Sequence, residues 1–187
     1  MRARHLKALL LASLGLLSLA ARAEIYIQVD GVVVGGSAAF GPWANAQVGD
    51  RASMIFAVPD QGEVLTPGHL EAYEILTTSF LMAIKTNDAI VGLRDSVVPL
   101  PTVTVSNDYP IADTFLMGPD AIPMSEFGYG LHFEVHDSTG TAWSSPTLAD
   151  IPGTYPAEAF DDREWFVFVG SGGFVLEMTE LIVYPAN

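Results

Sequence analysis

The sequence predicts an all-β fold, namely an antiparallel, jelly-roll-like β-sandwich that forms a single domain behind a signal peptide. Short apolar runs are separated by Gly, Pro, Asn and Asp along the chain, which is typical of strands joined by turns. Several runs alternate apolar with polar residues, as expected of strands that bury one face. The chain has no repeat of fixed period, which argues against a solenoid or a propeller.

Residues 1–23 have the three features of a cleavable secretory signal peptide. These are a positively charged start, a leucine- and alanine-rich stretch and a small-x-small cleavage signal, found at Arg2, Arg4 and Lys7, at 8–21, and at Ala21–Ala23. The apolar stretch is shorter than the roughly 20 residues that a membrane-spanning helix needs. We therefore predict a soluble mature domain over 24–187, secreted or periplasmic, with no membrane insertion after processing.

The charge of the predicted mature domain excludes one large class of partners. Four of the eight basic residues fall within the signal peptide, so four basic residues face 22 acidic ones from Glu24 onward, a net charge of −18. Such a surface repels phosphate backbones and anionic lipid. We expect no nucleic-acid partner.

The absence of Cys also excludes thiol chemistry and thiolate metal sites.

Four segments give the clearest strand signals. A strict alternation runs over 127–135, where Phe127, Tyr129, Leu131, Phe133 and Val135 are separated by polar residues or glycine. Thr102–Ser106 repeats this alternation, and Ala52–Val58 adds a further strand. Trp165–Val169 is a continuous apolar run, which suits a central strand.

The last predicted strand contains a change of phase. Gly170–Gly173 turns the chain into Phe174–Tyr184. Apolar residues in that strand occupy one phase up to Met178 and the other phase from Leu181. One extra residue between them would restore the alternation, so we predict a β-bulge near Thr179 and Glu180.

Two segments carry weaker signals. Asp30-Gly31 lies between apolar residues within 25–34, which predicts a two-residue hairpin turn. In Thr66–Ile84, Thr66-Pro67 could cap a helix, and four apolar residues have near-helical spacing, at Leu70, Tyr73, Leu76 and Phe80. We expect strands in that segment.

His132, Glu134 and His136 form the sharpest group of metal-ligating residue types. Alternate residues of a strand point the same way, so the three could present ligands on one face. The two histidines would nevertheless lie about 13 Å apart at Cα on a regular strand, too far to share one metal ion. We expect an ordinary polar strand face and not a transition-metal site.

Acidic loop residues suggest a different cation. Three groups stand out: Asn107, Asp108 and Asp113; Asp137; and Asp161, Asp162 and Glu164. Calcium takes oxygen ligands from such loops, and Asn107, Asp108 and Asp113 supply several of them within one turn-rich segment. We predict that any specific ion site is a calcium site at these three residues. The alternative is that Asp and Asn serve only as turn formers, as we also expect for the Asp137–Thr141 hairpin turn.

Other catalytic and ligand-binding signals are sparse. The chain has no Gly-x-Ser-x-Gly elbow, and Gly170–Gly173 opens no helix that could cradle a phosphate. A glycosidase needs only two facing carboxylates, for which Glu134 is the candidate that the sequence offers. Four aromatic residues in loop-like contexts could stack on saccharides, but we expect them to pack over the ends of the domain: Trp43, Trp143, Tyr109 and Tyr155.

A set of short motifs resembles a known group of proteins. The motifs are Val48-Gly49-Asp50, Val105–Asp108 followed by Asp113, and Leu131–Val135 followed by Asp137–Thr141. In this order they resemble exported bacterial β-sandwich proteins that often carry PEP-CTERM sorting tails. The resemblance implies an extracellular role associated with a surface or matrix. The stretch Val183–Asn187 has no Pro-Glu-Pro motif, apolar helix or basic tail, so we do not expect membrane sorting.

These observations support two hypotheses about function. The first is an exported, non-enzymatic protein that binds or structures something outside the cytoplasm, such as an extracellular polysaccharide or protein, without catalytic residues or a cofactor. The alternative is a carbohydrate-active enzyme that uses paired carboxylates. A concave face bearing Glu134, a second carboxylate and exposed aromatic residues would favour the enzyme, whereas a flat polar face would favour binding or structure.

Overall fold

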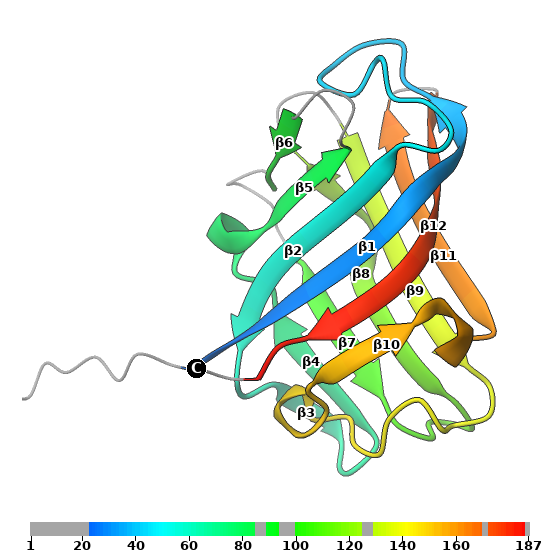
Figure 1. The fold of residues 1–187 in the computed structure, drawn as a ribbon. Helices are drawn as coiled ribbons and strands as arrows, with labels where there is room; N and C mark the ends of the chain where they lie inside the picture. The colour runs from blue at the N-terminus through cyan, green and yellow to red at the C-terminus, as the bar shows by residue number, and fades with distance from the viewer. Residues whose placement is uncertain (1–22, 85–88, 94–99, 125–128, 170–171, 186–187) are drawn as a thin grey trace, which may run out of the picture.

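The computed structural model describes residues 23–84, 89–93, 100–124, 129–169 and 172–185, and these form an antiparallel all-β protein (Figure 1). The prediction of an antiparallel all-β fold is confirmed. The predicted signal peptide falls on residues 1–22 and lies outside the described residues, as do Phe127 and the first half of the Gly170–Gly173 turn. Within the described ranges, no helix has the length and apolar character needed to span a membrane.

Twelve strands make up the described part of the sheet. They are β1 (Glu24–Ser37), β2 (Arg51–Pro59), β3 (Glu63–Thr66), β4 (Leu70–Glu74), β5 (Leu81–Ile84), β6 (Ala89–Val91), β7 (Thr102–Ser106), β8 (Asp113–Met124), β9 (Tyr129–Asp137), β10 (Gly153–Pro156), β11 (Asp162–Val169) and β12 (Gly172–Val183). Short 3₁₀ turns join some of them, including η1 (Thr77–Ser79), η3 (Leu148–Asp150) and η4 (Ala157–Ala159). The predicted strands over 52–58, 102–106 and 165–169 correspond to β2, β7 and β11.

The strands belong to one sheet with the order β3-β4-β7-β8-β9-β11-β12-β1-β2-β5-β6, and β10 pairs separately with β12. Figure 1 shows that the sheet curls into a half-barrel, with β5, β2 and β1 crossing in front of β7, β8 and β9. The first and last of the described strands, β1 and β12, lie side by side near the middle of the order. The curl gives the sheet an inner and an outer face.

Two sets of backbone contacts link strands that are far apart in the sheet order. Leu93, just after β6, forms an isolated antiparallel bridge with Met124 at the end of β8. Near the C-terminal end of β2, the Leu76 N–H donates to the Ala57 carbonyl oxygen at 2.9 Å. The Ala57 N–H in turn donates to the Ser79 hydroxyl at 2.8 Å. These contacts join strands from the two halves of the sheet order and hold the curl of the sheet.

Aromatic side chains fill the inner face. Every second residue of β9 is buried, and Phe133 packs edge-on against Trp165 with 5.8 Å between ring centroids. Phe115 packs against the same Phe133 at 6.1 Å, and Phe56 stacks on Phe80 at 6.0 Å. Burying one such ring contributes about 1.5–3 kcal/mol. Apolar packing of this kind stabilises the fold, since the chain has no disulfide to do so.

The predicted β-bulge in β12 is confirmed. Asp30 pairs with Glu180 and Gly31 pairs with Met178, so Thr179 is the extra residue on β12. Buried positions in β12 change phase at this point, from Met178 to Leu181. The bulge keeps the apolar side chains on both sides of it on the inner face.

The predicted hairpin turn at Asp30-Gly31 is wrong. The strand β1 runs through both residues and stays paired with β2 along most of its length. The glycine serves a different need, because a Cβ at Gly31 would collide with the Glu177 carbonyl oxygen and the Trp165 ring. The residue allows β1, β12 and the core tryptophan to approach closely.

The segment Thr66–Ile84 contains strands and not an α-helix, as expected. It comprises the end of β3, all of β4 and β5, and the single turn η1. Tyr73, Phe80 and Met82 are buried against the inner face. The near-helical spacing of Leu70, Tyr73, Leu76 and Phe80 arises because these residues are divided between β4 and the segments on either side of η1.

Candidate functional site

The histidines and glutamate singled out in the sequence lie on the outer face of β9. Leu131, Phe133 and Val135 are fully buried, so the intervening side chains of His132, Glu134 and His136 must point the other way. Each of these three residues is half-buried. The predicted polar strand face is thus present.

The neighbouring strand β11 supplies the partners of this face. Antiparallel pairing places Phe166 opposite His132, Glu164 opposite Glu134, and Asp162 opposite His136. Directly opposite side chains on one face have Cβ atoms about 5 Å apart. The sheet therefore sets two glutamates side by side between a His–Phe pair and a His–Asp pair.

The sequence prediction that Asp161, Asp162 and Glu164 share a loop is wrong for two of them. Asp162 and Glu164 belong to β11, and only Asp161 precedes the strand. The apolar run begins at Trp165, but pairing with β9 extends the strand back to Asp162. Pairing with a distant segment overrides the local polar composition.

An aromatic row lies beside the two glutamates. The His132 ring stacks on Phe166 with 6.1 Å between centroids, and Phe166 lies 6.2 Å from Phe168. His132 Nε2 lies 3.3 Å from Glu164 Oε2, which couples the row to the carboxylates. Phe168 is 43% exposed, so the row ends at the surface.

The other end of the face is charged. His136 Nδ1 lies 3.8 Å from Asp161 Oδ1. Ser138 donates to Asp161 through its hydroxyl and through its N–H, the latter at 2.9 Å. These Ser138 hydrogen bonds, with His136 adding to them, lower the pKa of Asp161 below its ordinary value. Asp161 is therefore ionised at neutral pH.

The nearby arginine does not neutralise the paired glutamates. Arg163 Nη1 donates to the carbonyl oxygens of Ala157 and Phe160, both at 2.6 Å. A hollow of about 160 Å³ is lined by Glu134, His136, Asp162, Arg163 and Glu164. Pockets that enclose a small-molecule ligand measure about 300–1,000 Å³. The face is thus an open polar and aromatic surface with a shallow hollow.

The two histidines of this face make separate contacts. His132 contacts Glu164, and His136 contacts Asp161. Within the described ranges, no group of three or more His, Asp or Glu side chains is placed to hold a metal ion. The chemistry that this face offers is hydrogen bonding from two glutamates and stacking on the aromatic row.

No family model, curated protein or solved structure matches the chain. The resemblance to exported proteins that often carry PEP-CTERM tails therefore stays a prediction. The function of the face has to be inferred from its geometry and chemistry.

The residues of the predicted calcium site lie at the ends of β7 and β8, where Asp113 is fully buried. Asp113 Oδ1 accepts the Asp108 N–H, and Oδ2 accepts the Trp143 N–H, both at 3.0 Å. Burial raises the pKa of Asp113, the two N–H donors oppose this rise, and the charges of Asp108 and Asp137 add to it. This carboxylate fastens two loops to the sheet.

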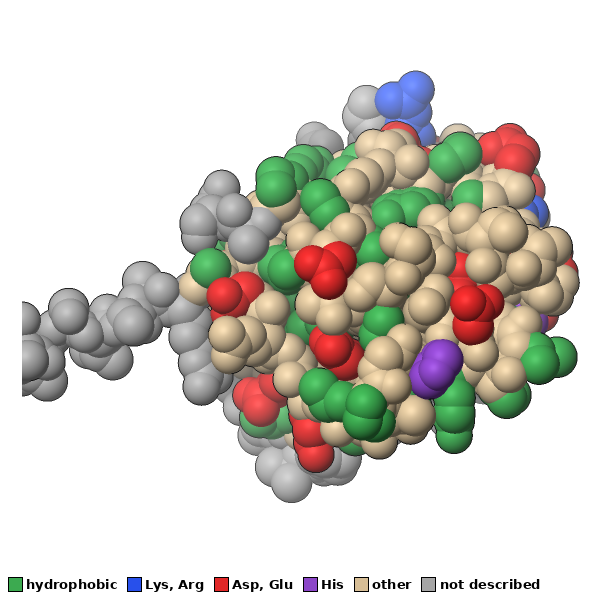
Figure 2. Space-filling view, turned by 90° about the horizontal axis from the view of Figure 1, so that it is seen from below, with side chains coloured by type: hydrophobic (Ala, Val, Ile, Leu, Met, Phe, Trp, Pro, Cys, Tyr) green, Lys and Arg blue, Asp and Glu red, His purple; other side chains and the backbone are tan. Residues whose placement is uncertain are grey.

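The other two residues of that prediction adjoin the buried aspartate through the backbone. Asp108 has a φ of 53°, in the left-handed region that Asp tolerates better than most residues. The Asn107 N–H donates to the His69 carbonyl oxygen at 2.8 Å. Figure 2, which views the end of the molecule where His69 lies, shows acidic side chains scattered there and basic ones only at its margin. Calcium binding at Asn107, Asp108 and Asp113 remains a prediction.

The sequence analysis identified Asp137 as a turn residue but did not predict that its side chain is buried. Asp137 ends β9 directly opposite Asp113. Its Oδ1 accepts the N–H and the hydroxyl of Thr139, and its Oδ2 accepts the N–H groups of Thr141 and Ala142, all within 2.9 Å. Burial alone would raise the pKa of Asp137, but these hydrogen bonds lower it to about 2. A signal was present, because an aspartate followed by Ser, Thr and Gly often bonds its own turn.

The segment 137–141 turns as predicted but does not form a hairpin. After β9 the chain continues to β10, which pairs with β12 and not with β9. Hydrogen bonds from the N–H groups of Thr141 and Ala142 to the Asp137 carboxylate stabilise the turn. The turn therefore does not depend on pairing between the strands before and after it.

The predicted packing role is confirmed for two of the four loop aromatics. Trp43 is fully buried, and Trp143 is buried with its Nε1–H donating to the Ser106 carbonyl oxygen at 2.6 Å. Tyr155 is half-buried against Trp143, with 5.7 Å between centroids, whereas Tyr109 is 44% exposed. The aromatic residues beside the glutamates come instead from β11, whose apolar run gave no sign that alternate residues face outward.

Proposed function

We propose that the chain is an exported, non-enzymatic protein that binds an extracellular polysaccharide on the outer face of β9 and β11. The observation that carries the proposal is the aromatic row of His132, Phe166 and Phe168 beside the paired Glu134 and Glu164. Sugar rings stack on aromatic side chains, and sugar hydroxyls donate hydrogen bonds to carboxylates. An open strand face suits a long polymer that passes across it.

The openness of the face favours binding over catalysis. Glycoside hydrolysis needs a carboxyl group on each side of the scissile bond, in a site that excludes bulk water. Here both glutamates rise from neighbouring strands on one surface, and the hollow between them measures only about 160 Å³. A saccharide could lie over the pair but would not be enclosed by it.

Export, a secreted or periplasmic location and a sandwich-like arrangement belong to the same proposal. The signal-peptide features of residues 1–23, the acidic composition and the motifs shared with exported bacterial proteins support export. The two layers of the curled sheet support the jelly-roll-like arrangement (Figure 1).

Binding of soluble polysaccharides to the purified protein, measured by affinity electrophoresis and calorimetry, tests this function. Phe166→Ala and Phe168→Ala should each weaken binding by about two- to tenfold, since stacking on an aromatic ring contributes about 0.5–1.5 kcal/mol. Tyr109→Ala is the matched control, because Tyr109 is 44% exposed and Phe168 is 43% exposed. Binding that is lost in the control and kept in both Phe variants would contradict the proposal.

One observation favours the alternative, a carbohydrate-active enzyme that uses paired carboxylates. Glu134 and Glu164 are directly opposite in the register, which gives Glu134 the second carboxylate that the sequence could not assign. Release of reducing ends from a polysaccharide would support the enzyme if Glu134→Gln and Glu164→Gln each abolish it. Binding without release in the unmodified protein supports the non-enzymatic function.

A further inference from the structure

A trough crosses the outer face of five neighbouring strands, away from the aromatic row. One line of residues directly opposite one another forms its axis, in the order Glu180 of β12, Asp30 of β1, Ser53 of β2, Ala83 of β5 and Ile90 of β6. The line runs perpendicular to the strands. The trough therefore has an acidic end, a middle of small residues and an apolar end.

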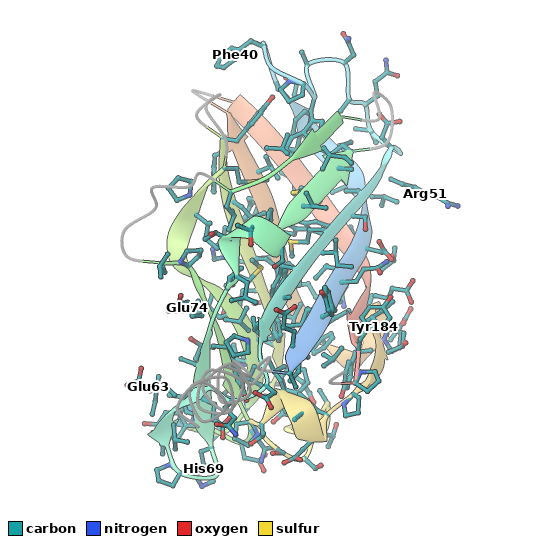
Figure 3. The ribbon with its side chains drawn as sticks, turned by 90° about the vertical axis from the view of Figure 1, so that its left-hand side faces the viewer. Phe40, Arg51, Glu63, His69, Glu74 and Tyr184 are labelled. Atoms are coloured by element: carbon teal, nitrogen blue, oxygen red, sulfur yellow. The ribbon has the colours of Figure 1, made fainter. Side chains whose placement is uncertain are left out.

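The small residues in the middle create the depression. Ser53 and Ala83 are flanked on one side by Ile55 and Leu81, which pair with each other, and on the other side by Arg51. The depression measures about 790 Å³. Figure 3 shows Arg51 extending away from the body of the molecule, so that the axis stays open. This volume is enough for several residues of an extended peptide.

Among the described residues, no cation pairs with the two carboxylates at the acidic end. Asp30 and Glu180 are directly opposite at the bulge of β12, and in the part of the chain that the structure describes neither forms an ion pair. Gln28 Nε2 donates to Asp30 Oδ2 at 2.6 Å, and the Tyr184 hydroxyl donates to Gln28 Oε1 at 2.8 Å. Like charges directly opposite in a sheet repel each other. A bound cation would relieve that repulsion.

The apolar end sets the length of the occupant. Ile90 is 63% exposed at the far end of the trough. Three strand spacings separate Ile90 from Asp30, which is about 14 Å at 4.8 Å per spacing. An extended peptide advances about 3.3 Å per residue, so about four residues cover the distance. A polyamine would bring a second charge to the apolar end, and a lone metal ion would leave that end unused.

We propose that this trough binds a lysine-bearing segment of a partner protein. The lysine ammonium lies between Asp30 and Glu180, its methylene groups lie along Val32, and an aliphatic side chain about four residues away covers Ile90. Charge complementarity selects a basic segment, because the chain from Glu24 onward has four basic and 22 acidic residues. The trough and the aromatic row lie on different strands of the outer face, with the trough on β12, β1, β2, β5 and β6 and the row on β9 and β11. Their residues do not overlap, so this inference can fail or succeed independently of polysaccharide binding.

Fluorescence anisotropy with a labelled Lys-Ser-Gly-Ser-Leu peptide and the full protein tests the proposal. Asp30→Asn and Glu180→Gln should each weaken binding at least about tenfold, since a charge-assisted hydrogen bond contributes about 1.5–3 kcal/mol. Ala83→Leu should weaken binding to a similar extent without changing the charge, because it fills the trough. Glu63→Gln, an exposed acidic residue on the edge strand β3, is the matched control and should change binding less than about twofold.

Competing ligands distinguish a lysine-bearing peptide from other cationic occupants of the trough. The same peptide with acetyl-lysine should not bind, and Phe166→Ala should bind the lysine peptide as the unmodified protein does. Equal losses in Glu63→Gln and Asp30→Asn would show diffuse charge attraction and overturn the proposal. Tighter binding of spermidine or of a glucosamine oligomer, with the same dependence on Asp30 and Glu180, would also overturn it. Melting temperatures verify that each variant is folded.

Discussion

Two pairs of opposed carboxylates illustrate contrasting uses of aspartate and glutamate in this sheet. Asp113 and Asp137 face each other across β8 and β9, where they are buried and their oxygens accept backbone N–H groups. Asp30 and Glu180 face each other across β1 and β12 on the outer face, where they have no ion pair among the described residues. The same cross-strand geometry stabilises loops in one place and sets two half-buried carboxylates of like charge side by side in the other.

The difference shows how to separate structural from functional carboxylates in a very acidic protein. A buried carboxylate that accepts several N–H donors is explained by the fold that it stabilises. Two carboxylates directly opposite each other on the outer face repel, which lowers the stability of the fold. A bound cation or hydrogen-bond donor would relieve the repulsion, so such a pair is a candidate binding site. Glu134 and Glu164 belong to the second kind, which is why variants of each kind should respond differently.

The largest effect should come from Asp137→Ala, which would destabilise the protein by about 3 kcal/mol or more. The substitution leaves the N–H groups of Thr139, Thr141 and Ala142 without their acceptor, and hydrogen bonds to charged groups contribute about 1.5–3 kcal/mol each. Urea unfolding measures the change, with the exposed Glu177→Ala as the control. Equal losses of stability in both variants would contradict the structural role of the Asp137 hydrogen bonds.

The two buried aspartates should also respond to acid with opposite signs. The pKa of Asp137 is about 2 in the folded state, against an ordinary value of 3.8. Its contribution to stability is therefore present above pH 3.8 and is lost as the pH falls towards 2. The pKa of Asp113 is raised, so its ionisation costs stability at neutral pH, and this cost disappears as the pH falls through its folded-state pKa.

Urea unfolding at a series of pH values tests these signs. Asp137→Asn should lose the steep fall in unfolding free energy between about pH 4 and pH 2 that the unmodified protein shows. In the unmodified protein, protonation of Asp113 should raise the free energy of unfolding as the pH falls through the folded-state pKa of this residue. The Asp113→Asn variant should lack this rise. Parallel curves for both variants would contradict the assignment.

A smaller effect of opposite direction is expected on the outer faces. Asp30→Asn and Glu134→Gln should each stabilise the protein by about 0.5 kcal/mol, because each removes one of two like charges directly opposite in the sheet. Thermal melts at low salt measure the gain, which should shrink at high salt. A loss as large as that of Asp137→Ala would show that these carboxylates also support the fold.

Calcium should have the smallest effect. Binding at Asn107, Asp108 and Asp113 would add about 0.4 kcal/mol of stability when calcium equals its Kd. We expect the affinity for calcium to be low, because both oxygens of Asp113 already accept N–H groups. Melts with calcium, magnesium and sodium at equal ionic strength should show a calcium-specific rise that Asp108→Asn and Asp113→Asn remove. Identical melting temperatures in all three salts would leave these residues as turn formers.

Strands and their buried faces were predictable because alternation is a local property of the sequence. The alternating residues of β9 and β7 correctly gave the inner and outer faces, and the change of phase in β12 correctly gave the bulge at Thr179. Local reasoning failed at Asp30-Gly31, where a turn signal proved to be a close approach between strands.

The candidate sites were less predictable because they depend on register between distant segments. Glu134 was singled out on its own strand, but its neighbour Glu164 was assigned to a loop. For Asp30 the sequence predicted only a turn, and for Glu180 only a nearby bulge. Nothing local to either residue indicates that the two lie directly opposite each other in the sheet. Cross-strand partners follow from the order of strands in the sheet, which alternation does not encode.

The pairing of the first strand with the last has a consequence for the timing of folding. β1 completes its pairing only with β12, and β12 also joins β11 to the rest of the sheet (Figure 1). A growing chain that stops short of β12 would hold two separate blocks of strands, each with an unpaired edge. The finished sheet can therefore form only after β12 has been synthesised, so its central pairing joins segments that are about 150 residues apart in sequence and closes late in folding.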